Sequence, residues 1–99
     1  MKYNSRILDL ARNDLKEIRT YLSDFGSSPK HKLRESFNEY VKNVSNNPYI
    51  YPEYEENNMY RKAVIHYDYL VFYTVDEENK TVKIQRVLSS RQNVKNILD

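Results

Sequence analysis

The first half of the chain repeats hydrophobic residues at helical spacing. Steps of three and four residues separate the members of the first series, Leu8, Ala11, Leu15, Ile18, Leu22 and Phe25. A second series follows, Leu33, Phe37, Tyr40, Val41 and Val44. Between them lies Gly26, the one glycine of the chain, in a position where a left-handed backbone turn would suit glycine best. The pattern predicts two antiparallel helices joined by a short turn, with Pro48 ending the second.

The second half is rich in β-branched and aromatic residues, which favour strands. Three segments have this character, at 59–67, 69–76 and 80–89. Short polar connections at 67–68 and 77–79 predict an antiparallel meander. A weaker pattern over 2–8 favours a short opening strand. We therefore expect an α+β fold in which an N-terminal helical hairpin packs on an antiparallel sheet of three to four strands, as a single domain over residues 1–99.

Two remaining segments are less regular. Residues 49–58 hold three tyrosines, three glutamates and no base, a composition typical of a loop. This loop is either a surface connector whose tyrosines pack on the sheet or a recognition loop, since tyrosine makes rigid amphipathic contacts. Residues 90–99 suit either an extended tail or a short helix, which Val94, Ile97 and Leu98 favour by their spacing.

Composition and charge exclude several classes of protein. Sixteen Lys and Arg against fourteen Asp and Glu leave a net charge of +2, too little to hold nucleic acid by bulk electrostatics alone. The charge is uneven, because residues 80–99 carry five bases and one acid. The absence of Cys excludes disulfides and cysteine-ligated zinc, and the two histidines, His31 and His66, lack metal-ligand spacing. We expect no metal and no cofactor.

No run of residues approaches the length of apolar sequence that a membrane span requires, which is about 20 residues. No apolar segment of the kind found in secretory signals follows the first residues. We therefore expect a cytoplasmic protein without a membrane partner.

Two blocks of sequence together resemble a known family. Residues 11–22 are similar to the A-x-x-D-L-x-x-I-x-x-Y-L opening of bacterial RelE/ParE-superfamily toxins. Residues 60–62, 69–76 and 82–88 resemble that family's Y-R-K, Y-x-V-F-Y-x-V-D and V-x-I-x-R-V-L core, in the same order. The resemblance implies the toxin of a type II toxin-antitoxin system, of the kind linked to plasmid stabilization, which inhibits growth until a cognate antitoxin neutralises it.

The resemblance leaves the target open between two mechanisms. RelE-like members cleave mRNA on the ribosome, whereas ParE-like members bind and poison DNA gyrase. Laid on the RelE pattern, Arg61 and Arg91 match two basic positions, but Ala63, Leu70 and Ile97 replace the other functional residues. Metal-free RNA cleavage needs a base and an acid, and arginine transfers protons poorly because its pKa exceeds about 12. We expect a ParE-like toxin that acts on gyrase by protein contact.

Two alternatives remain. The first is an enzyme, a ribosome-dependent and metal-independent mRNA endonuclease, for which the weak catalytic candidates are Arg61, His66 and Arg91. The second is an inactive family member that only binds its antitoxin. A lone histidine such as His66 is a proton carrier in the physiological range, although most such residues are only hydrogen-bonded or exposed.

The expected contact residues fall into two groups. The target-binding candidates are Arg61, Lys62, Arg86 and Arg91. For Arg86, which alternation places on one strand face with core residues, the competing interpretation is an ion pair with an acid such as Asp14. For Arg61 and Lys62 the competing interpretation is that they are ordinary polar residues of a half-exposed strand. Antitoxin-binding candidates with exposed ring surface are Tyr21, Tyr40, Tyr49 and Tyr51, along the helical hairpin and over the sheet.

Overall fold

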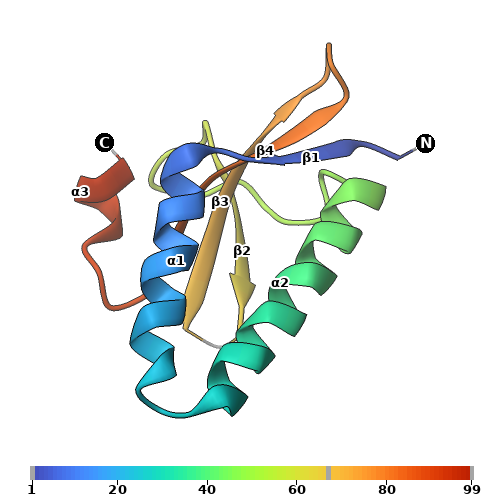
Figure 1. Cartoon of the computed structure of the whole chain (residues 1–99). Coiled ribbons are helices and arrows are strands. Elements are labelled where there is room, and N and C mark those ends of the chain that lie inside the picture. The colour runs from blue at the N-terminus through green and yellow to red at the C-terminus, as the bar shows by residue number, and fades with distance from the viewer. Residues whose placement is uncertain (1, 67, 99) are drawn as a thin grey trace.

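The chain folds as a helical hairpin against one face of a four-stranded sheet, as the computed structural model shows (Figure 1). The structure describes residues 2–66 and 68–98. In chain order the elements are β1 (Asn4–Ile7), α1 (Asp9–Ser23), α2 (Ser27–Asn46), β2 (Arg61–Ile65), β3 (Tyr69–Asp76), β4 (Thr81–Ser89) and α3 (Val94–Leu98). The expected α+β class is confirmed, and the C-terminal segment forms the short helix rather than a tail.

The sheet has the strand order β1-β4-β3-β2 and is mixed rather than antiparallel. Strands β2, β3 and β4 form the expected antiparallel meander. Strand β1 pairs parallel to β4, so the prediction of a purely antiparallel sheet is wrong for this strand. No hairpin joins β1 to β4, because the helices and two strands separate them along the chain, and therefore no tight turn imposes an antiparallel direction.

The helices bury most of the stripes that their spacing predicts, but Phe25, the last residue of the first stripe, lies past the end of α1 and is 60% exposed. Buried hydrophobic residues on the two helices are Ala11, Leu15, Leu22, Leu33, Phe37, Tyr40 and Val44. They pack with the sheet residues of the same core, which include Val71, Tyr73, Val82 and Ile84. Burying each large side chain contributes about 1.5–3 kcal/mol, so this interface supplies most of the driving force for the fold. Gly26 stands between the helices with φ of +96°, a backbone region that favours glycine.

A bulge in the β3–β4 pairing changes which residues of β4 face the helices. Phe72 pairs with Arg86, but the next residue, Tyr73, pairs with Ile84, so one residue of β4 has no partner. After the bulge the helix-side core continues at Val87. The prediction that Arg86 shares the core-facing row is therefore wrong, because a bulge inserts one residue into the alternation.

The loop between α2 and β2 packs on the sheet, as the connector interpretation predicts. The Tyr51 ring lies 5.7 Å from that of Tyr40 and 6.3 Å from that of Tyr73. On the opposite face, the Tyr54 ring lies 5.1 Å from the buried ring of Phe72. Among residues 2–66 and 68–98, no helix has both the length and the apolar character needed to cross a membrane.

Tyr40 is a core residue, so the prediction that it offers exposed ring surface is wrong. Its side chain lies on the face of α2 that packs on the sheet, and the residue is 1% exposed. The ring contacts Phe37, Tyr51 and Tyr73, and burial raises the pKa of its hydroxyl. Among the described residues this hydroxyl has no hydrogen-bond partner. The hydroxyl of Tyr73, also buried, donates to the carbonyl oxygen of Pro48 at 2.8 Å.

Removal of the Tyr73 hydroxyl and removal of the Tyr40 hydroxyl should affect the free energy of unfolding differently. Tyr73→Phe is expected to lower the free energy of unfolding by about 1–2 kcal/mol, because the carbonyl of Pro48 loses its buried donor. Tyr40→Phe should leave it unchanged or raise it by up to about 1 kcal/mol, because a buried hydroxyl without a partner is removed. Urea denaturation of both variants measures the difference. Equal losses would contradict this assignment.

Candidate functional site

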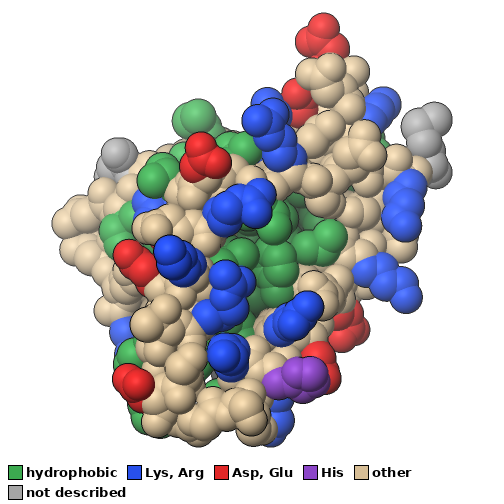
Figure 2. All heavy atoms as spheres, in the orientation of Figure 1, with side chains coloured by type: hydrophobic (Ala, Val, Ile, Leu, Met, Phe, Trp, Pro, Cys, Tyr) green, Lys and Arg blue, Asp and Glu red, His purple; other side chains and the backbone are tan. Residues whose placement is uncertain are grey.

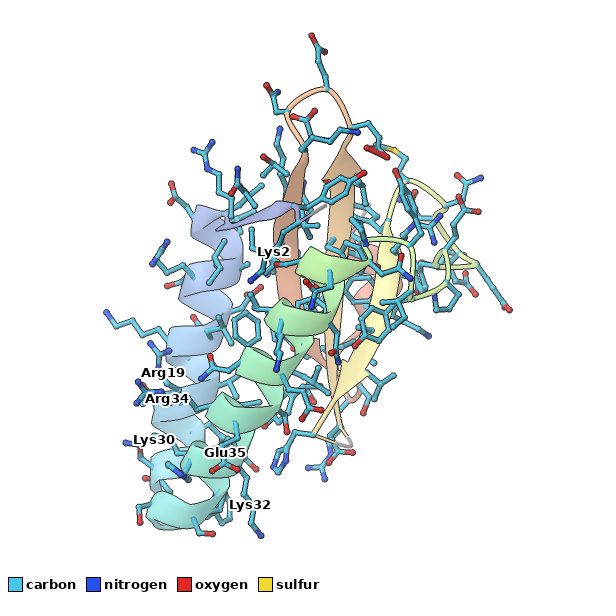
Figure 3. The ribbon with its side chains drawn as sticks, turned by 90° about the vertical axis from the view of Figure 1, so that its right-hand side faces the viewer. Lys2, Arg19, Lys30, Lys32, Arg34 and Glu35 are labelled. Carbon is cyan, nitrogen blue, oxygen red and sulfur yellow. The ribbon has the colours of Figure 1, made fainter. Side chains whose placement is uncertain are left out.

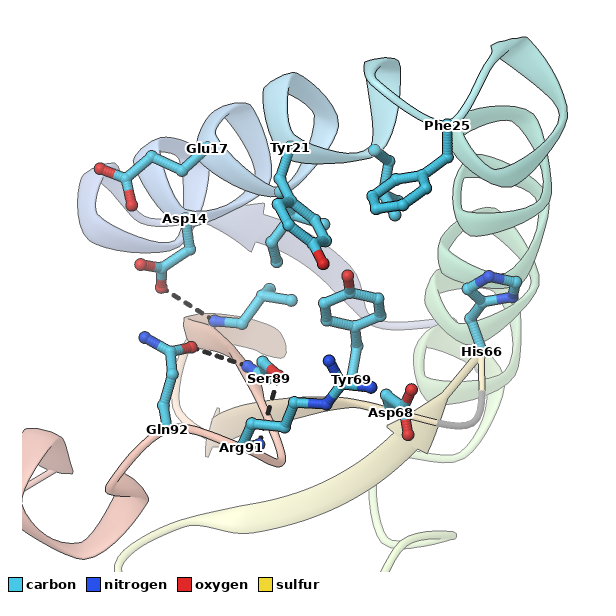
Figure 4. A pocket seen from close by; sticks show the side chains of 13 residues that line it. Asp14, Glu17, Tyr21, Phe25, His66, Asp68, Tyr69, Ser89, Arg91 and Gln92 are labelled. Carbon is cyan, nitrogen blue, oxygen red and sulfur yellow. Dashed lines mark hydrogen bonds between the residues drawn. The ribbon is translucent and has the colours of Figure 1, made fainter.

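A pocket of about 480 Å³ opens between α1, the start of β3 and the end of β4 (Figure 4). Its charged or titratable lining residues are Asp14, Glu17, His66, Asp68 and Arg91. Its aromatic lining residues are Tyr21, Phe25 and Tyr69. These residues come from three segments that lie far apart in the sequence, so only the folded chain assembles the pocket. We call it the α1–β4 pocket.

Arg91 is held at the edge of the α1–β4 pocket by the turn that follows β4. Its backbone N–H donates to the hydroxyl of Ser89 at 3.2 Å. The side chain of Gln92 folds back to accept the N–H of Ser89 at 2.8 Å. In Figure 4 the Arg91 side chain extends toward Tyr69 and Asp68, and among the described residues it forms no ion pair. The expected position of Arg91 just past a strand end is confirmed.

His66 enters the same pocket from the turn between β2 and β3. Its ring stacks on Tyr69, with 6.4 Å between ring centroids and 3° between planes. Its φ of +46° is one that histidine tolerates better than most residues, and the carbonyl of His66 accepts the N–H of Asp68 at 2.7 Å. The expected turn includes residue 67, which lies outside the described residues. His66 and Arg91 are thus brought together.

An exposed aromatic pair, Tyr21 on α1 and Phe25 just past its end, forms the far wall of the pocket. Tyr21 and Phe25 are 53% and 60% exposed, and their rings meet edge to face at 5.3 Å. The hydroxyls of Tyr21 and Tyr69 point toward one another in Figure 4. Burial raises the pKa of Tyr69, and the nearby Tyr21 and Asp68 act in the same direction.

The sequence predicts antitoxin contact for Tyr21, and its expected site residues do not include Glu17, Phe25, Asp68 or Tyr69. Part of the signal was present, since Glu17 and Tyr21 lie four residues apart on α1 and Phe25 follows four residues later, just past the helix end.

Asp14 and Arg86 form the ion pair that the sequence suggests. The Arg86 guanidinium donates from Nε at 2.8 Å and from a terminal nitrogen at 2.9 Å to the two carboxylate oxygens. Asp14, which is 7% exposed, also accepts the backbone N–H of Val87 at 3.0 Å. The paired carboxylate raises the pKa of Arg86. Arg86 therefore joins β4 to α1, at the wall of the α1–β4 pocket.

Arg61 and Lys62 lie away from this pocket and hold the loop before β2. Arg61 donates to the carbonyl of Tyr51 at 2.8 Å and stacks its guanidinium 4.9 Å from the ring centroid of Tyr49. The Lys62 ammonium lies 5.5 Å from the ring centroid of Tyr54. These contacts favour a structural role for both residues.

Strand register explains why Arg61 and Arg91 do not meet. Arg61 pairs with Tyr73 of β3, whereas Ser89, two residues before Arg91, pairs with Tyr69. Four residues of strand span about 13 Å, so the two arginines belong to different regions of the sheet. The structure thus groups His66 with Arg91 and separates both from Arg61.

Tyr49 belongs to an exposed polar cluster around Glu77. The hydroxyls of Tyr49 and Tyr3 both donate to the Glu77 carboxylate, the latter at 2.6 Å. The Lys80 ammonium lies 3.1 Å from the same carboxylate. These donors lower the pKa of Glu77 to about 2. The ring of Tyr49 is 46% exposed, so part of it remains accessible.

Because Glu77 accepts these hydrogen bonds in its charged form, we expect the free energy of unfolding to fall in acid. Its folded pKa of about 2 lies below the ordinary 4.5, so the charged form stabilises the fold above about pH 4.5, and this contribution disappears as pH falls toward 2. Glu77→Gln should be less stable than the parent near pH 6, and the two should converge near pH 2. Urea denaturation across this range tests it, with Glu78→Gln as control. A gap independent of pH would contradict the prediction.

Within residues 2–66 and 68–98, no three His, Asp or Glu side chains gather in a way that could hold a metal ion. The pocket instead presents an arginine, carboxylates and aromatic rings to solvent.

Comparisons with known proteins agree on the family. Residues 6–94 match the family model described as the ParE toxin of type II toxin-antitoxin systems, parDE. No curated protein sequence matches the chain.

Three solved structures have a similar fold. The toxin-antitoxin complex RelBE2 from Mycobacterium tuberculosis is 24% identical with a TM-score of 0.66, covering 90% of this chain and 92% of that one. A mutant of E. coli toxin RelE in the free state is 17% identical with a TM-score of 0.70, covering 98% and 93%. The archaeal RelE-RelB complex from Pyrococcus horikoshii OT3 is 21% identical with a TM-score of 0.57, covering 93% and 99%.

The matched sequence spans most of the chain, and the solved structures share its arrangement of helical hairpin and sheet. The chain belongs to the ParE toxin family of type II toxin-antitoxin systems.

Proposed function

We propose that this toxin acts on DNA gyrase by protein contact, through the α1–β4 pocket, rather than as a ribonuclease. The charge of the pocket carries the proposal. Three carboxylates, those of Asp14, Glu17 and Asp68, line it together with one arginine, Arg91. Even with Arg86 counted beside Asp14, the acids outnumber the bases. Such a surface disfavours the phosphates of mRNA, which a nuclease must hold.

The remaining lining supports contact with a protein. Tyr21 and Phe25 are exposed aromatic residues beside Arg91, whose guanidinium has no ion pair among the described residues. Aromatic residues and arginine are the residue types that contribute most to protein interfaces. A pocket that combines them suits a hot spot of protein binding.

One observation favours ribosome-dependent mRNA cleavage as a second candidate. His66, whose imidazole is a candidate acid or base, lines the same pocket as Arg91, whose guanidinium could stabilise a charged transition state. Arg61, the other basic position expected for this chemistry, contributes to the loop instead.

The groove between α1 and α2 supports the proposal that a cognate antitoxin covers the toxin. Figure 2 shows hydrophobic side chains on the floor between the two helices, with Lys and Arg on both sides. Two of the similar structures are toxin-antitoxin complexes. An antitoxin segment with apolar anchors suits such a groove. Tyr21 and Tyr49 are exposed and Tyr51 is half-buried, so their rings remain candidates for antitoxin contact. Both proposed partners place the toxin in the cytoplasm.

Two parallel assays on the purified toxin separate the mechanisms. A gyrase supercoiling assay should show inhibition or accumulated cleaved DNA, while cell-free translation with primer extension should show intact mRNA. Cleavage at ribosomal A-site codons would refute the gyrase proposal and support the nuclease. A lack of effect in both assays, with tight antitoxin binding retained, would instead indicate an inactive member of the family.

A further inference from the structure

A second concavity, of about 650 Å³, lies at the joint of the helical hairpin, between the last turns of α1 and the first turns of α2. Four of the chain's sixteen Lys and Arg residues line it, which are Lys16, Arg19, Lys30 and Arg34. None of the described Asp and Glu side chains does. We call it the hairpin pocket. The charge is therefore concentrated here in a chain whose net charge is only +2.

The basic side chains of the hairpin pocket lack protein counter-ions. None of the four forms an ion pair among residues 2–66 and 68–98. His31, which also lines the pocket, lies 2.9 Å from the Glu35 carboxylate. Figure 3 shows Arg19, Lys30 and Arg34 gathered on one side, with Lys32 projecting away from them. Like charges gathered without partners repel one another, and an anion bound between them would relieve that repulsion.

The rest of the lining consists of hydroxyl groups. Thr20, Ser23, Ser27 and Ser28 complete the pocket, and no apolar side chain lines it among the described residues. The hydroxyls of Thr20 and Ser23 donate to the carbonyls of Lys16 and Arg19 at 3.0 and 2.8 Å, so Ser27 and Ser28 supply the hydroxyl donors for a ligand. At the start of α2 no side chain caps the helix and no acid occupies its first turn. Arginine, lysine, serine, threonine and free backbone N–H groups are the usual donors to nucleic-acid phosphates. An acidic peptide would instead require apolar anchors, which this pocket lacks.

We propose that the hairpin pocket binds the phosphate backbone of duplex DNA, without reading its sequence. The donor set argues for phosphates. The choice of DNA over RNA rests on the proposed function, because gyrase acts on DNA. The pocket is also distinct from the α1–β4 pocket, whose lining is acidic. One surface would thus engage the target protein while another holds the nucleic acid beside it.

Fluorescence anisotropy with the 99-residue chain and a labelled duplex of about 20 base pairs tests this, over about 50–200 mM salt. The pocket variant combines Arg19→Gln, Lys30→Gln and Arg34→Gln. The matched control removes the same charge at exposed residues outside the pocket, with Arg12→Gln, Lys32→Gln and Lys42→Gln. Circular dichroism confirms that both variants fold. No gyrase is present, so the outcome is independent of whether gyrase is the target.

The pocket variant should bind the duplex at least about 10-fold more weakly, and its salt dependence should fall by about one unit of slope for each phosphate that the variant no longer neutralises. The control should change affinity less than about threefold. Equal weakening in both variants would overturn the proposal, since general charge would then explain binding. Tighter binding to single-stranded RNA of the same sequence would overturn the choice of DNA. Equally tight binding to polyglutamate would overturn the choice of nucleic acid and indicate an acidic protein partner instead.

Discussion

Asp14→Ala is expected to lower the free energy of unfolding by about 3 kcal/mol, the largest loss that we anticipate for a single polar side chain. The Asp14 carboxylate is 7% exposed and accepts three hydrogen bonds, two from Arg86 and one from the N–H of Val87. Its removal leaves a half-buried guanidinium without its anion and a buried N–H without an acceptor. The Arg86 side chain is 22% exposed, so water recovers part of the cost and keeps the loss at the low end of the range.

Urea denaturation of a double-mutant cycle measures this coupling. Arg86→Ala alone and the double variant with Asp14→Ala complete the cycle, and the double variant should be more stable than the sum of the single losses implies. Glu17→Ala, one turn along the same helix and exposed, is the control and should change stability by less than about 0.5 kcal/mol. A loss below about 1 kcal/mol for Asp14→Ala would show that the ion pair contributes little to stability.

Arg91→Ala is expected to weaken the inhibition of gyrase, so that the toxin concentration required for half-inhibition rises at least about tenfold. The Arg91 guanidinium lines the α1–β4 pocket without an ion pair to any described residue, so its hydrogen-bonding capacity is available to a target. Because the residue is exposed and follows the last strand, the melting temperature should stay close to that of the parent. Arg91→Lys should restore only part of the inhibition, because an ammonium cannot make the paired hydrogen bonds of a guanidinium.

Lys95→Ala is the matched control for Arg91→Ala. Lys95 is a nearby cation on α3 that does not line the pocket, and its ion pair with Glu56, at 3.8 Å, is exposed. Its loss should leave inhibition within about twofold of the parent. Unchanged inhibition by Arg91→Ala, or equal losses in both variants, would remove Arg91 from the target-binding surface.

The local elements were predictable because their signals are local. The period of the hydrophobic residues predicted α1 and α2, and the β-branched and aromatic runs predicted β2, β3 and β4, because packing against one core requires those spacings. The pairing of Asp14 with Arg86 was one of the two interpretations that the sequence left open for Arg86, since Asp14 is an acid on the helix expected to pack on this sheet. The bulge was not foreseen, because one extra residue in a strand leaves no mark on composition.

The residues that line the two pockets could not be predicted in this way, because each pocket is formed by segments that lie far apart in the sequence. Arg61 and Arg91 looked like parts of one basic set, yet strand register pairs Arg61 with Tyr73 of β3, whereas Arg91 follows Ser89, the partner of Tyr69. Tyr40 carried the same signal as Tyr21, an aromatic residue on a helix, but one faces the sheet and the other solvent. The basic residues of the hairpin pocket are spread over two helices, and only the turn at Gly26 brings them together.

The sequence alone therefore determined the α+β class, the helical hairpin, the meander and the family, since these follow from periodicity and from motifs within short stretches of chain. The tertiary structure decided the parallel pairing of β1, the burial of Tyr40, and the separation of an acidic, aromatic pocket from a basic one. The physical reason is that a pocket's charge is the sum of side chains from distant segments. That sum depends on helix orientation and strand register, which only packing of the whole chain sets.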